Sequence, residues 1–126
     1  MTDFVLNAHA GWQYVAILAV VVSLVFAYRS LEMSSTAETT YRVTAVVVDI
    51  QVALGIIAWI AVSGWELGFL QGWVHPIAGI AAVGVLHAFI GRARKAERSQ
   101  ANTIVRTGTL IAVVLVLVAI GIGEMA

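Results

Sequence analysis

The sequence predicts an all-α integral membrane protein, a four-transmembrane-helix up-down-up-down bundle in which residues 1–126 form a single domain. The first observation is composition, because 61% of the residues are hydrophobic and only 11% are charged. A soluble domain carries ~25% charged residues and could not cover so much apolar surface in water. The second observation is the presence of apolar runs of membrane-spanning length, and the third is the placement of the basic residues.

Four segments have the ~20 mostly apolar residues that a helix needs to cross ~30 Å of hydrocarbon. We expect the spans at Leu6–Tyr28, Tyr41–Ser63, Gly72–Ile90 and Thr103–Gly123. None shows the strict alternation of a barrel strand, and each is about twice the length of one. The short connections favour antiparallel neighbours in the order of the chain.

The basic residues predict the orientation of the bundle. All seven Lys and Arg residues flank the first and third connections, namely Arg29, Arg42, Arg92, Arg94, Lys95, Arg98 and Arg106. By the positive-inside rule these connections face the cytoplasm. We therefore predict a multi-pass protein of a bacterial or archaeal cytoplasmic (inner) membrane, with both termini on the non-cytoplasmic side. The formal net charge of zero gives no indication of a nucleic-acid partner.

Histidines within the spans are the main functional candidates, because an ionisable residue inside a membrane is costly and suggests function by default. His9 and His75 lie near the outer ends of the first and third spans. These spans run in the same direction, so the two side chains are expected at one depth on diagonal helices. We predict that they are the axial ligands of haem b, with the haem iron as the metal. Gly11, Gly55 and Gly79 would leave room for the macrocycle.

A structural interpretation of this pair stays open. Pro76 suits the first turn of a helix, which would make His75 an exposed residue at a helix start. The outer side also offers no Lys or Arg to haem propionates. The donors that remain there are Asn7, Trp12, Gln13, Gln71 and Trp73.

A second set of polar residues lies in the inner half. Asp49, His87 and Arg106 are expected at similar depth and form one predicted cluster, with a structural ion pair as the simplest interpretation. His87 is alternatively a ligand of a second haem or a proton-transfer group at a quinone site. Gln51 lies about 200° around the helix from Asp49 and is expected in helix packing with Thr44 and Gly55.

Three stretches carry a resemblance to a family of small bacterial four-helix membrane proteins labelled cytochrome b-like. They are His9-Ala10-Gly11 with Tyr14, Asp49-Ile50-Gln51 with Gly55, and His75-Pro76 followed by His87 and Ile90-Gly91-Arg92. The resemblance covers most of the chain at about a dozen specific positions. It implies a membrane cytochrome-like protein.

The function expected from these patterns is electron transfer through a membrane-embedded b-type haem, with quinone or a partner redox protein as the exchange partner. One alternative is a haem-free accessory subunit of a larger respiratory or photosynthetic membrane complex. Another is a small homo-oligomeric proton-linked carrier that uses Asp49 and His87. The chain has no cysteine, HExxH motif or phosphate-binding glycine loop, and the sequence assigns no enzymatic activity.

Overall fold

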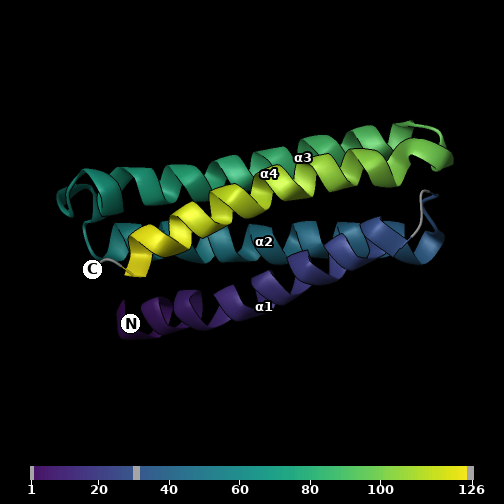
Figure 1. Ribbon diagram of the computed structural model, residues 1–126. Coiled ribbons are helices and arrows are strands. Elements are labelled where there is room, and N and C mark those ends of the chain that lie inside the picture. The colour runs from purple at the N-terminus through teal and green to yellow at the C-terminus, as the bar shows by residue number, and fades with distance from the viewer. Residues whose placement is uncertain (1, 30–31, 125–126) are drawn as a thin grey trace.

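The computed structural model describes residues 2–29 and 32–124, and long helices make up almost all of this part of the chain. The helices are α1 (Thr2–Arg29), α2 (Ser35–Ala61), α3 (His75–Lys95) and α4 (Arg98–Glu124). A 3₁₀ turn, η1 (Gly64–Glu66), and a π-helical turn, η2 (Leu70–Val74), join α2 to α3. The helices alternate in direction along the bundle, as predicted (Figure 1).

Each of the four helices is long and apolar enough to cross a membrane, as expected for a multi-pass membrane protein. Their outer surfaces carry large apolar side chains, and Leu18, Val114 and Leu117 are each 60–63% exposed. Such a surface is costly in water and suits a hydrocarbon solvent.

The helices extend beyond the predicted apolar spans at their polar ends. α4 begins at Arg98 instead of Thr103, and α2 begins at Ser35 instead of Tyr41. The Ser34 side chain caps α2 by accepting a hydrogen bond from the Ala37 backbone N–H at 3.1 Å. Hydropathy therefore located the part of each helix that matches the hydrocarbon, whereas polar caps decide where the helix begins.

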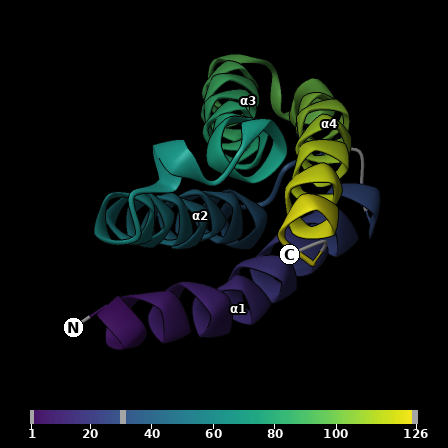
Figure 2. The same ribbon diagram turned by 90° about the vertical axis from the view of Figure 1, so that its left-hand side faces the viewer.

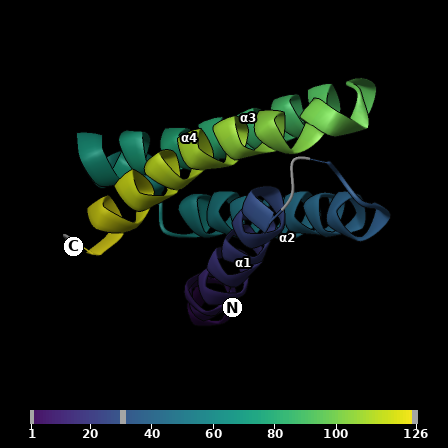
Figure 3. The same cartoon turned by 45° about the vertical axis from the view of Figure 1, so that its right-hand side comes forward.

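The bundle consists of two tightly packed helix pairs, α1 with α2 and α3 with α4. The pairs meet along α2–α3 and α1–α4, so that α1 and α3 are diagonal (Figure 2). The N-terminal half of α1 crosses α2 obliquely and diverges from α4 (Figures 2 and 3). α1 is therefore further from α4 at the N-terminal end of α1 than at its C-terminal end (Figure 2).

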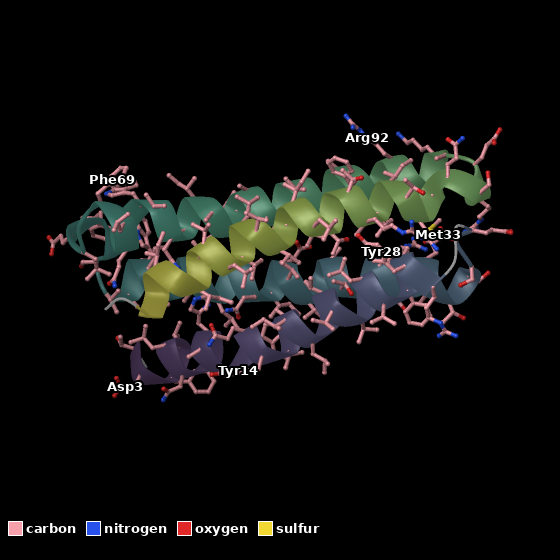
Figure 4. The ribbon with its side chains drawn as sticks, in the orientation of Figure 1. Asp3, Tyr14, Tyr28, Met33, Phe69 and Arg92 are labelled. Atoms are coloured by element: carbon pink, nitrogen blue, oxygen red, sulfur yellow. The ribbon has the colours of Figure 1, made fainter. Side chains whose placement is uncertain are left out.

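We call the end that carries the α1–α2 and α3–α4 connections the arginine end and the opposite end, with Thr2 and Glu124, the terminal end. Figure 4 shows Tyr28, Met33 and Arg92 towards the arginine end and Asp3 and Phe69 at the terminal end. All seven basic residues belong to the arginine end, in helices or connections on that side.

The arginine end is held by a buried polar contact that joins the two helix pairs. The Tyr41 hydroxyl donates to Asn102 Oδ1 at 2.6 Å, and both side chains are 1% exposed. Asn102 Nδ2 in turn donates to the Glu32 carbonyl at 3.1 Å. Because a satisfied buried network fixes one helix arrangement, it holds α2, α4 and the α1–α2 connection together at this end.

Gly108 sets the close approach of α4 to α3, and its replacement by alanine is expected to destabilise the bundle. An added Cβ would collide with Phe89 Cβ and Cγ, which cannot move without shifting α3. Overpacking of this kind costs ~1–3 kcal/mol. Thermal unfolding in detergent should therefore show a lower Tm for Gly108→Ala.

The matched control is Gly84→Ala, because no atom lies within 4 Å of a Cβ added at Gly84 on the neighbouring helix. The control should unfold at or slightly above the wild-type temperature, since alanine favours a helix over glycine. Equal Tm values for the two variants would contradict the packing shown for α3 and α4.

Candidate functional site at the terminal end

His9 and His75 meet across the centre of the bundle at its terminal end. Their ring centroids are 6.2 Å apart and the ring planes make an angle of 89°. His9 lies in the third turn of α1, and His75 begins α3 directly after η2. α1 and α3 run in the same direction, so the turns that carry His9 and His75 lie at one level. The packing of the helices points both imidazoles towards the bundle interior.

Each imidazole is oriented by a backbone carbonyl on the helix beside it. His9 Nδ1 donates to the Gln51 carbonyl on α2 at 3.2 Å, and His75 Nδ1 donates to the Ala119 carbonyl on α4 at 2.7 Å. A carbonyl only accepts, so Nδ1 carries the proton and the Nε2 lone pair is left in each neutral ring. Neither Nε2 has a hydrogen-bond partner among the described residues.

The alternative in which His75 is an exposed residue at a helix start does not describe this geometry. Pro76 does occupy the first turn of α3, as its ring predicts. However, the backbone from Leu70 to Val74 is already helical, and His75 is only partly exposed. The helical backbone therefore begins before His75, in the π-helical turn η2.

Gly55 on α2 makes room for the His9 ring. A Cβ added there would lie 2.8 Å from His9 Cε1 and 3.3 Å from Nδ1. The ring consequently rests against bare helix backbone. Gly79 has a looser environment, with Val52 Cγ2 at 3.8 Å, and no atom lies within 4 Å of a Cβ added at Gly11. Among Gly11, Gly55 and Gly79, Gly55 is the glycine whose missing side chain leaves space for a histidine ring.

A cavity of about 300 Å³ surrounds the histidine pair. All four helices line it, and its walls are almost entirely apolar. Its polar lining consists of His9, Gln13, Gln51, Trp59 and His75. The volume is at the lower limit of the ~300–1,000 Å³ typical of ligand and cofactor sites. The cavity lies where α1 diverges from α4, and its lining residues Val21 and Leu117 are also exposed on the outer surface (Figure 2).

Gln51 contributes more to this cavity than the sequence indicated. It lines the cavity, its carbonyl orients His9, and its buried Oε1 has no hydrogen-bond partner among the described atoms. A buried acceptor without a donor is unfavourable by ~1–3 kcal/mol, so a donor from water or a ligand would stabilise it. Thr44, which was expected in the same packing stripe, lies between helices, and its hydroxyl is 2.7 Å from Ser23 Oγ.

An aromatic cluster borders the cavity at Trp59. The Trp59 ring makes edge contacts with Trp65 and Trp73, at centroid distances of 5.2 and 5.6 Å. Its indole N–H donates to the Gly72 carbonyl at 2.7 Å. No Lys or Arg is among the described residues that line the cavity. The cavity is therefore an uncharged site.

The acceptors that orient the histidines could not be identified from the sequence. Ala119 lies in the uniformly apolar part of α4, which was expected only to pack or face lipid. Every residue carries a backbone carbonyl, and residue type does not indicate which one a side chain will reach. The same holds for Trp12, whose indole N–H donates to the Val47 carbonyl at 2.8 Å instead of facing the cavity.

The inner polar residues separate into two groups. His87 Nε2 lies 2.8 Å from Asp49 Oδ1 and 3.0 Å from Oδ2, so the structure brings these two together. Arg106 turns away from them to α1, where its Nε donates to the Ala27 carbonyl at 2.6 Å and its guanidinium lies over the Tyr28 ring. The predicted three-residue cluster is therefore an Asp49–His87 pair and a separate arginine contact.

Within residues 2–29 and 32–124, no group of three or more His, Cys, Asp or Glu side chains is placed to hold a metal ion. His9 and His75 together supply two imidazoles, fewer than the three or four protein ligands of a zinc site. Comparison with known proteins finds no family model, curated sequence or solved structure that matches this chain.

Proposed function

We propose that the protein is a b-type cytochrome-like electron carrier of a bacterial or archaeal cytoplasmic membrane, with both termini outside. His9 and His75 would hold the haem iron, and membership of the cytochrome b-like group is part of the proposal. The observation that carries it is the pair of oriented imidazoles inside one cavity. Electrons would be exchanged with a quinone or a redox partner at the membrane.

The separation of the two rings supports this assignment. Two imidazoles that bind opposite sides of one metal, with bonds of ~2.0–2.1 Å, have ring centroids about 6 Å apart. The observed 6.2 Å agrees with that distance. The free Nε2 atoms and the Nδ1 bonds to carbonyls are the protonation state and outer contacts that metal-bound histidines show in proteins.

The surroundings of the pair fit a porphyrin in polarity, although they supply no counter-charge. The apolar walls provide a low-polarity environment, and Gly55 allows His9 to stand close to α2. Haem propionates would need to reach the polar end of the bundle, because the cavity itself contains no basic side chain. When bound, haem supplies reversible one-electron chemistry, and the residues of the chain hold the ligands and exclude water.

The test is an absorbance spectrum of the purified protein in detergent, before and after reduction with dithionite. A bis-histidine haem b gives a sharp Soret band and an α band on reduction. We expect these bands in protein expressed with added haem precursor. If haem supplementation yields neither band in folded protein, the haem proposal is wrong.

A haem-free accessory subunit is the second candidate, and the same hydrogen bonds favour it. His9 joins α1 to α2 and His75 joins α3 to α4, so both already have a role within a helix pair. In that case replacing either histidine would lower stability without a spectral consequence, and the protein would co-purify with larger membrane partners.

A further inference from the structure

The Asp49–His87 pair is exposed on the outer surface of α2 and α3, although both residues lie within predicted membrane spans. The side chains of His87 and Asp49 are 52% and 42% exposed. Both helices are long enough to cross a membrane, so this surface faces lipid when the bundle is in a bilayer. An ionisable pair facing hydrocarbon is costly, which indicates that another molecule contacts it.

The depth of the pair follows from its spacing to the arginines on the same helices. Asp49 follows Arg42 by seven residues, and His87 precedes Arg94 by seven. Seven residues are about two helical turns, or ~10 Å, and return to nearly the same side of the helix. The pair therefore lies ~10 Å further along the two helices than Arg42 and Arg94, on the side of the bundle centre.

A groove connects the arginines to the pair. It has a volume of about 220 Å³ and lies between α2 and α3. Arg42, Arg94 and His87 all line it. The walls between them are small or apolar, formed by Ala45, Val46, Ile90 and Gly91. The groove therefore accommodates a flat or slender group that reaches His87 from the bilayer.

The atoms left available at the pair define the chemistry of that group. His87 Nε2 is committed to Asp49, and His87 Nδ1 has no partner among the described residues. Nδ1 accepts a hydrogen bond when the ring is neutral with its proton on Nε2 and donates one when the ring is protonated. The ligand must thus be lipid-soluble and carry an oxygen able to accept or donate.

We infer that this groove binds the head group of a lipid-soluble quinone, with a quinone oxygen at His87 Nδ1. A phospholipid head group would stay at the level of Arg42 and Arg94, whereas a quinone head is apolar enough to reach the pair. The quinone carbonyl accepts from the protonated ring, and the quinol hydroxyl donates to the neutral ring. The redox role of this quinone rests on the proposed function, whereas the binding of the quinone in the groove does not.

The test is photolabelling with a decyl-tailed azidobenzoquinone, using the full-length protein in phosphatidylcholine nanodiscs. Labelled peptides are mapped by mass spectrometry, with excess decylubiquinone as competitor. We expect competed labelling at α2 around Val46 and at α3 around Ile90. Asp49→Asn and His87→Phe should each weaken competition at least about tenfold, because hydrogen bonds to charged groups are the stronger ones.

The matched control is Ile80→Phe, which introduces the same side chain at an exposed position of the same helix that lines neither the cavity nor the groove. It should leave competed labelling of the groove unchanged. Its haem spectrum is recorded separately, so a failed haem proposal and a failed quinone proposal give different results. Labelling of the groove in protein that binds no haem supports the quinone site alone.

Three results would overturn the inference. The first is labelling that decylubiquinone does not compete or that His87→Phe leaves unchanged. The second is phosphatidylglycerol retained by the wild type and lost in Arg42→Gln, together with no quinone binding, which would assign the groove to a lipid head group. The third is a dimer that His87→Phe dissociates without any quinone binding, which would make this face a contact between copies.

Discussion

Replacement of His75 by alanine is expected to abolish the reduced haem spectrum, and replacement of His9 is expected to do the same. Each removes one of the two imidazoles whose ring centroids are 6.2 Å apart. Loss of an outer contact to a metal ligand costs ~10–100-fold in affinity, and loss of the ligand itself should cost more. The measurement is the reduced-minus-oxidised difference spectrum of equal amounts of folded protein.

The matched control is His87→Ala, because His87 lies on the same helix and pairs with Asp49 instead of the cavity. It should retain both the Soret and the α band. Loss of the bands in His87→Ala with retention in His75→Ala would move the haem to the other end of the bundle. Circular dichroism of all three variants separates a lost ligand from a lost fold.

Gly55→Val should weaken haem binding although it leaves both histidines in place. Even the first added carbon would lie 2.8 Å from His9 Cε1, and the valine methyl groups crowd the ring further. Overpacking costs ~1–3 kcal/mol, which corresponds to ~10–100-fold in binding if the strain is relieved by displacing His9. Titration of the purified apoprotein with haemin, followed at the Soret band, measures this change.

Gly11→Val is the control for this substitution, because no atom lies within 4 Å of a Cβ added at Gly11. It should bind haemin with wild-type affinity. Equal affinities of the two variants would show that His9 does not need its position against α2. That result would argue for a structural role of His9 and so favour the haem-free candidate.

The class of the protein and the depth of its polar residues were accessible from the sequence. Hydropathy predicts helices that the structure contains, and the common direction of α1 and α3 brings His9 and His75 to one level. Depth depends only on position along a helix and on helix direction. Both can be inferred from apolar runs and short connections.

The rotation of each helix about its own axis could not be inferred from the sequence. This rotation decides which side chains meet at the site. His9 and His75 could have pointed apart at the same depth, and Asp49, His87 and Arg106 were expected together. In the structure Arg106 contacts Ala27 and Tyr28, because the oblique course of α1 brings its end to that part of α4. In a chain that is apolar on nearly every face, no amphipathic stripe indicates which side of a helix faces inward.

The sequence by itself therefore determined a bundle of four apolar helices, the direction of each, and the level of each ionisable side chain. These properties depend on composition and on distance along one chain. The tertiary structure decided that the two histidines face each other, that the Gln51 and Ala119 carbonyls orient them, and that Asp49 and His87 lie on an exposed face. Those contacts join residues 38 to 66 positions apart, and only the packing of one helix against another selects them.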